Sequence, residues 1–134
     1  MTAIGILGSG GRMGRAIGDA LASHGATLAG GIDAGGDPGP LAVAADVLVD
    51  FTVPGALAAN LAAARTAATP ILIGTTGLNA AHHRLIDEAA AEIAVIQTGN
   101  TSLGVTLLAQ LVREAAQRLG PAWDIEIVDM HHRA

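Results

Sequence analysis

Cysteine and lysine are absent from this chain of 134 residues, and aromatic residues are nearly absent, with one tryptophan, one phenylalanine and no tyrosine. Without cysteine the chain has no disulfide framework and no thiolate metal site, and we expect no bound metal. So few aromatic side chains disfavour a platform on which nucleic-acid bases stack. The net charge of −5, with no basic run, also disfavours binding to nucleic acid or to an anionic membrane surface.

Long apolar runs are also lacking, and none approaches the roughly 18 residues of a membrane span. The first residues, MTAIGILG, carry no basic stretch and lead directly into a glycine turn, which is not the pattern of a signal peptide. We therefore expect a soluble, cytoplasmic protein. Apolar residues nevertheless make up 51% of the chain, and many of them are alanines. Small apolar side chains suit helices packed closely on a parallel sheet, and the length suits one domain.

Short apolar runs alternate along the chain with longer, alanine-rich stretches. The runs predict strands over residues 3–7, 27–32, 47–51, 70–73, 93–97 and 125–128. Helices are predicted over residues 13–23, 54–67, 79–91 and 102–119, and the turn formers AGGDPGP at residues 34–40 indicate a loop. The strands are continuously apolar, as strands covered on both faces must be. This pattern predicts an α/β fold, a doubly wound parallel sheet of Rossmann type with about six strands.

A glycine-rich turn, GSGGRMG at residues 8–14, follows the first predicted strand. Glycines let a backbone approach a phosphate closely, and the helix beyond offers free N–H groups and the positive end of its dipole. The spacing departs from G-x-G-x-x-G. Either Gly8 and Gly10 fit and the third glycine comes late, at Gly14, or the set is Gly8, Gly11 and Gly14. A tight turn without a ligand is the alternative, but its place after the first strand favours a dinucleotide site.

Asp33 ends the second predicted strand. An acidic residue in this place hydrogen-bonds the ribose hydroxyls of an adenosine, although a solvated turn aspartate is the alternative. Ala34 follows it, so a 2′-phosphate here would lie beside a carboxylate without a neighbouring cation. This pattern favours NAD, while Arg12 in the glycine turn leaves NADP open.

Turns rich in threonine and glycine follow the later strands: DFTVP from residue 50, GTTG from residue 74 and TGNTS from residue 98. Ordinary turn chemistry would explain any one of them. Because the carboxyl ends of parallel strands meet at one edge of a sheet, the three together indicate the wall of a nicotinamide pocket.

These motifs, in this order, resemble the 4-hydroxy-tetrahydrodipicolinate reductase (dihydrodipicolinate reductase) family of the diaminopimelate route to lysine. The matching stretches run from end to end of the chain: GSGGRMGR, DFTVP, GTTG, TGNTSLGV and WDIEIVDMHHR. The resemblance implies hydride transfer to a small dicarboxylate substrate from the reduced form of NAD, with NADP as the alternative cofactor. It also implies a set of cofactor-binding residues: Gly8, Ser9, Gly10, Gly11, Arg12, Met13, Asp33, Gly74, Thr75, Thr76, Thr98, Gly99, Asn100 and Thr101.

The resemblance also gives roles to two histidines near residue 134. His131 would be the catalytic residue that transfers a proton, and His132 would contact the substrate. In the family, a lysine, a Gly-Thr segment and a second domain with the tetramer interface follow, and these would lie past Ala134. We therefore expect residues 1–128 to form the dinucleotide-binding domain and residues 129–134 to begin a truncated catalytic segment, with a homotetramer expected for the full-length family.

Two other functions stay open at this stage. One is a stand-alone module that binds or senses NAD(H) without turnover, which the missing lysine favours for the chain as it stands. The other is a methyltransferase with a similar first turn, which is more distant because the GTTG and HHR stretches would have no role there.

Overall fold

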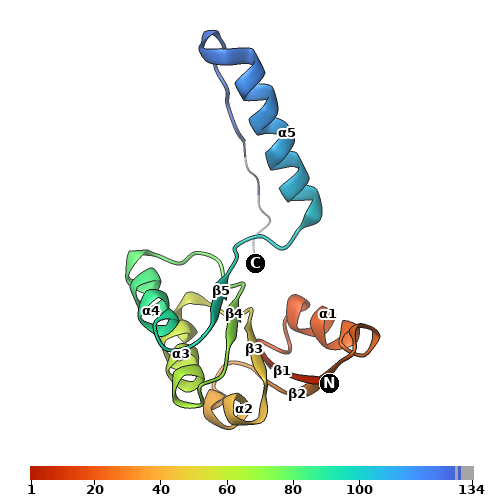
Figure 1. The fold of residues 1–134 in the computed structure, drawn as a ribbon, viewed down its shortest axis with the longest axis vertical. Helices are drawn as coiled ribbons and strands as arrows, with labels where there is room; N and C mark the ends of the chain where they lie inside the picture. Colours follow the sequence, from red (N-terminus) through yellow and green to blue (C-terminus); the bar gives the residue numbers. More distant parts are fainter. Residues whose placement is uncertain (129, 131–134) are drawn as a thin grey trace. The chain divides into compact units, whose positions relative to one another are not determined.

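The computed structural model of the chain describes residues 1–128 and 130 and consists of two units, Met1–Gly99 and Asn100–Ala134. Five parallel strands form one sheet in the first unit, in the order β2-β1-β3-β4-β5 (Figure 1). The strands are β1 (Thr2–Leu7), β2 (Ala26–Ile32), β3 (Val47–Asp50), β4 (Ile71–Ile73) and β5 (Val95–Gln97). The predicted α/β, doubly wound fold is confirmed.

Helices cover both faces of this sheet (Figure 1). On one face lies α1 (Arg12–Ala20), and on the other lie α2 (Pro38–Ala44), α3 (Leu57–Thr66) and α4 (Ala80–Ala90). The step from β1 to β2 runs one way across the sheet and every later step runs the other way, so right-handed connections place α1 opposite the other helices. The strand order reverses between β1 and β3. At such a reversal a crevice forms beyond the carboxyl ends of the strands.

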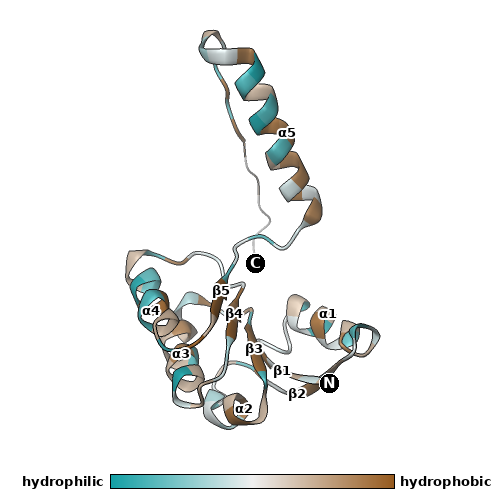
Figure 2. Ribbon diagram, in the orientation of Figure 1, coloured by the Kyte–Doolittle hydropathy of each residue, from teal (hydrophilic) through white to brown (hydrophobic). Residues whose placement is uncertain are grey.

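The core lies between the sheet and the layer made by α2, α3 and α4. Leu7, Leu48 and Ile73 are fully buried on three strands, and Leu57 at the start of α3 belongs to the same cluster. Figure 2 shows apolar residues along β3, β4 and β5 and polar residues on α4. Burial of Leu48, Ile71 and Ile73 in this core explains the apolar runs of β3 and β4.

Helix α2 corrects the sequence prediction, which gave residues 34–40 as a loop. Pro38 stands in the first turn of the helix, and the Asp37 side chain caps it by accepting a hydrogen bond from the Gly39 N–H at 2.9 Å. Leu41 and Ala42 are buried. Proline in the first turn and aspartate at the cap both favour a helix start, so these turn formers mark a boundary.

Two short 3-10 helices refine the other boundaries. The helix predicted from Pro54 begins with η2 (Pro54–Ala56) before α3. The first predicted helix ends with η1 (Ala22–His24) after α1. Gly25 closes η1 in the left-handed conformation, with φ of 69°.

The second unit consists of α5 (Leu103–Leu119) and η3 (Gly120–Ala122). Ser102 caps α5, its hydroxyl accepting a hydrogen bond from the Val105 N–H at 3.3 Å. Residues 125–128, all of them described, form no strand, so the predicted sixth strand is wrong. An apolar run becomes a strand only where another strand pairs with its backbone, and the pattern alone cannot supply that partner. In the described parts of the chain, no helix is long and apolar enough to cross a membrane.

Candidate functional site

Glycines at the two ends of the turn after β1 allow its close packing. Gly8 has φ of +87°, and a Cβ there would lie 2.7 Å from the carbonyl oxygen of Phe51. A Cβ on Gly14, in the first turn of α1, would overlap the carbonyl oxygen of Gly8. Only glycine fits these two positions. They are common to both spacings considered for the motif.

The two middle glycines have different neighbours. Gly10 donates its N–H to both carboxylate oxygens of Asp33, at 2.8 and 3.0 Å. Gly11 precedes α1 with extended backbone, φ −72° and ψ 169°, and borders two cavities. Gly10 therefore links the turn to β2, whereas Gly11 borders the space open to a ligand.

Asp33 follows β2 and lies beside the glycine turn. Besides the Gly10 N–H, it accepts a hydrogen bond from the Ser9 hydroxyl to Oδ2 at 3.1 Å. Oδ1 takes one hydrogen bond and keeps one acceptor position, because each carboxylate oxygen accepts about two. Asp33 thus holds the glycine turn against β2, which the sequence did not reveal.

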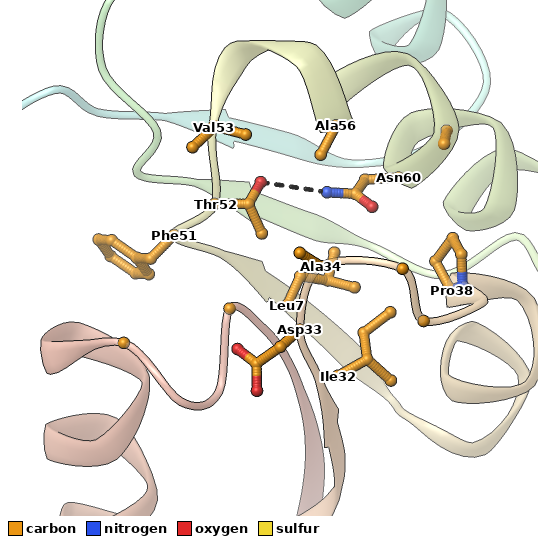
Figure 3. A pocket seen from close by; sticks show the side chains of 15 residues that line it. Leu7, Ile32, Asp33, Ala34, Pro38, Phe51, Thr52, Val53, Ala56 and Asn60 are labelled. Atoms are coloured by element: carbon orange, nitrogen blue, oxygen red, sulfur yellow. Dashed lines mark hydrogen bonds between the residues drawn. The ribbon is translucent and has the colours of Figure 1, made fainter.

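A first cavity, of about 440 Å³, opens at the ends of β1, β2 and β3 (Figure 3). Asp33 and the glycine turn lie on one side, and Thr52 and Asn60 lie on the other, with Asn60 Nδ2 donating to Thr52 Oγ1 at 3.4 Å. The remaining lining residues are apolar or small: Leu7, Gly8, Gly11, Ile32, Ala34, Gly35, Gly36, Pro38, Phe51, Val53, Ala56 and Ala59. None of the lining residues, all of which are described, is an arginine or a histidine.

A second cavity, of about 210 Å³, shares three residues with the first, namely Gly11, Phe51 and Thr52. The other residues that line it are Arg12, Met13, Gly74, Thr75 and Thr76. Gly74 makes room for the aromatic ring of Phe51, because a Cβ on Gly74 would overlap that ring. The predicted GTTG segment and the glycine turn, far apart in sequence, therefore lie on one cavity.

A buried carboxylate lies at the end of β3 and contacts residues that line both cavities. Asp50 is fully buried, and its Oδ1 accepts hydrogen bonds from the N–H and the hydroxyl of Thr52, at 2.9 and 2.6 Å. The Thr75 hydroxyl donates to the same oxygen at 3.1 Å, and Asn60 Nδ2 donates to Oδ2 at 3.0 Å. Sequence reasoning missed this group. The available signal was an aspartate at the end of an apolar strand, in DFTVP.

The remaining predicted cofactor-binding residues are Thr98, Gly99, Asn100 and Thr101. The Thr98 N–H donates to the Ile73 carbonyl at 2.9 Å, and Gly99 ends the first unit. Asn100 and Thr101 belong to the second unit, where Asn100 Oδ1 accepts a hydrogen bond from the Ser102 N–H at 2.8 Å.

The two histidines of the predicted catalytic segment, His131 and His132, lie outside the described residues. Their roles in proton transfer and substrate binding stay predictions. The same is true of the proposed division into residues 1–128 and 129–134.

Comparison with known proteins gives consistent results. The family model described as "Dihydrodipicolinate reductase, N-terminus" matches residues 2–101. The chain is 51% identical over 137 residues to the 4-hydroxy-tetrahydrodipicolinate reductase of Zymomonas mobilis, covering 97% of this chain and 54% of that protein. Proteins of the same name from Rhodopseudomonas palustris and Afipia carboxidovorans are 41% and 40% identical over 153 residues, covering 96% of this chain and 56% of each relative.

The chain belongs to the dihydrodipicolinate reductase family. The resemblance carried by the motifs is thus confirmed. Every residue that lines the two cavities lies within the matched residues 2–101 of this reductase-family chain. The chain spans about half the length of the curated relatives that it matches, 54% and 56%.

Proposed function

We propose that this chain is the cofactor-binding part of an NAD(P)H-dependent 4-hydroxy-tetrahydrodipicolinate reductase of the diaminopimelate route to lysine. The observation that supports it most is the pair of adjoining cavities between the ends of β1 and β3. Dinucleotides bind at this reversal of strand order in open parallel sheets. Family membership favours the reductase over a stand-alone module that binds or senses NAD(H) without turnover.

The glycine turn and the start of α1 suit the pyrophosphate of a dinucleotide. Within α1 the first N–H to bond back along the helix is that of Arg15, which donates to the Gly11 carbonyl at 3.0 Å. The N–H groups of Met13 and Gly14 precede it, and such groups at the positive end of a helix favour an anion. Arg12, which lines the second cavity, adds positive charge nearby.

The first cavity suits an adenosine. Ile32, Val53 and Ala56 give it apolar surface for a flat base, and Oδ1 of Asp33 has an acceptor position for a ribose hydroxyl. Ala34 follows Asp33, and no cationic side chain is among the described lining residues. A 2′-phosphate would therefore meet a carboxylate without compensation, so we propose NADH as the preferred cofactor and NADPH as the weaker one.

The second cavity suits the nicotinamide end. A bound, reduced nicotinamide supplies the hydride that reduces the dicarboxylate substrate. Gly74 and Thr76 contribute to the wall of this cavity, and the ring of Phe51 borders both cavities. We assign proton donation to His131 and substrate binding to His132, since a histidine titrates near neutral pH and suits a positioned acid.

Calorimetric titration of the 134-residue chain with NADH and with NADPH tests this function. We expect saturable binding of NADH at one site per chain and weaker binding of NADPH. A folded chain that binds neither nucleotide would contradict the proposal.

A further inference from the structure

We infer that Asp50 is a positioning residue for the cofactor, whose buried carboxylate holds the loops after β3 and β4 and helix α3 together beneath both cavities. The inference deepens the proposed function and rests on it, because the bound molecule is taken to be NADH.

The partners of this carboxylate come from three different elements. Thr52 follows β3, Thr75 follows β4 and Asn60 lies in α3, and all three donate hydrogen bonds to Asp50. Each of them also lines a cavity: Asn60 the first, Thr75 the second and Thr52 both. The group that joins these residues therefore sets the relative positions of both cavity walls.

The loops after β3 and β4 are also joined directly. The N–H of Thr52 donates to the Thr75 hydroxyl oxygen at 3.1 Å, while that hydroxyl donates its proton to Asp50. Thr75 is only 5% exposed, so its side chain holds the loop and does not stand free in the cavity. Loss of the carboxylate would release both loops.

The charge on Asp50 also sets the direction of the Thr52 hydroxyl. That proton is donated to Asp50 at 2.6 Å, so the oxygen can only accept a hydrogen bond from a molecule in either cavity. A ribose hydroxyl or a carboxamide N–H matches an acceptor of this kind, whereas a phosphate oxygen does not.

Stability alone is a weak reason for a carboxylate in this place. A buried charge is costly unless it is fully hydrogen-bonded, and a well-packed apolar side chain is often as stabilising or more so. Among the described residues, the buried polar side chains are Asp50, Asn60, Thr69 and Thr75, and all but Thr69 belong to this network. The polar interior of the unit is thus concentrated under the cavities.

Thr69 provides a matched control. Like Thr75 it is 5% exposed, and its hydroxyl donates to the carbonyl of Ala42 at 2.7 Å. It lines neither cavity. Both Thr69→Val and Thr75→Val preserve the shape of the side chain. Thr69→Val removes a hydroxyl that donates to a carbonyl, whereas Thr75→Val removes one that donates to Asp50 and also accepts from the Thr52 N–H.

Calorimetric NADH titration and thermal unfolding of the 134-residue chain separate positioning from stability. We expect both threonine variants to lower the melting temperature, and Thr75→Val to lower it more because it loses the hydrogen bonds to both Asp50 and Thr52. Thr75→Val should weaken NADH binding about three- to ten-fold, while Thr69→Val leaves it within about two-fold of the wild type. Equal effects of the two variants on NADH affinity would overturn the inference.

An exchange of partners gives a second test. Asp50→Asn can keep an oxygen toward Thr52 and Thr75, but its amide then faces the amide of Asn60, and we expect NADH to bind about ten- to one-hundred-fold more weakly. The double variant Asp50→Asn with Asn60→Asp exchanges donor and acceptor across the same contact and should regain most of that loss.

The outcomes of this exchange are distinct. Wild-type NADH affinity in Asp50→Asn, or a double variant that regains stability but not NADH binding, would overturn the inference. Should Asp50→Asn not fold, the comparison of Thr75→Val with Thr69→Val decides. A wild-type chain that folds but binds no NADH would overturn the proposed function, and this inference with it.

Discussion

Gly11 is the residue at which nucleotide binding can be changed with the least effect on folding. Gly8 has a left-handed backbone, and Gly14 has no room for a Cβ, so substitution of either would disturb the turn itself. The backbone of Gly11 is extended, a conformation that valine adopts, and a Cβ there would lie 3.2 Å from the Gly8 carbonyl oxygen.

We predict that Gly11→Val weakens NADH binding at least about ten-fold and lowers the melting temperature only slightly, because the new side chain stands where the nucleotide would lie. Calorimetry and thermal unfolding measure the two effects. Gly55→Val is the control, since a Cβ on Gly55 meets no atom within 4 Å. Unchanged NADH affinity in Gly11→Val would mean that the turn is structural only.

Asp33 and Ala34 determine the choice between NADH and NADPH in this account. Asp33→Ala removes the acceptor for the ribose hydroxyl and also the hydrogen bond to Gly10. It should therefore weaken NADH binding by about 1–2 kcal/mol and reduce the difference in affinity between NADH and NADPH. Ala34→Arg adds a cation beside the position of the 2′-phosphate and should strengthen NADPH binding by about 1–2 kcal/mol. Titration of both variants with both nucleotides is the measurement. Tighter binding of NADPH than NADH by the wild type would contradict the assignment.

At the scale of the elements, the sequence predicts five strands correctly because each contains a short, mostly apolar run. Residues 125–128 carry the same pattern without becoming a strand, since pairing depends on a neighbour that the pattern does not encode. Helix α2 was missed because proline and glycine are turn formers in general, yet they also occur in the first turn of a helix.

The candidate site could likewise be predicted only in part from the sequence. The glycine turn and Asp33 could be predicted because each is a short motif that follows a strand. Asp50 contacts Asn60 and Thr75, which lie 10 and 25 positions further along the sequence, and no local motif signals such contacts. Only the fold brings these residues together.

The ion pair of Arg65 with Glu92 joins α3 to the segment before β5 and gives a pH-dependent prediction. Arg65 Nε donates to Glu92 Oε2 at 3.0 Å, and a second bond joins Nη2 to Oε1. The hydrogen bond from Arg65 lowers the pKa of Glu92 below its ordinary value of 4.5. Since the folded chain has the lower pKa, the pair's contribution is present above about pH 4.5 and is lost as the pH falls through the folded value.

We therefore expect Glu92→Gln to lower the melting temperature slightly at neutral pH and to have less effect in acid. The effect is small because both side chains are partly solvated. Thermal unfolding at neutral and acidic pH measures it, with Asp87→Asn, a residue of the neighbouring helix α4, as the control. Identical pH profiles for the two variants would contradict this role of the pair.

For the whole molecule, we expect NADH binding without efficient turnover. The chain spans 54% of its Zymomonas mobilis relative, and the substrate's two carboxylates need cationic and N–H partners in fixed positions. Fusing the chain to the remaining C-terminal part of that relative should give turnover of 4-hydroxy-tetrahydrodipicolinate. In the fusion, His131→Ala should reduce the rate by about 10²–10⁴, and His83→Ala, exposed on α4, should not. Equal turnover by the 134-residue chain alone would contradict this division of roles.

In the complex that we propose, a nicotinamide dinucleotide lies across the carboxyl ends of β1, β2, β3 and β4. An NMR titration of the isotope-labelled chain with NADH, followed at the backbone amides, tests it most directly. We predict that the shifting amides cluster at residues 8–14, 33–36, 51–60 and 74–76, while Ala26, Asp46 and Thr69 at the opposite ends of the strands do not shift. Shifts confined to that opposite edge, or no shifts in a folded chain at saturating NADH, would contradict the account.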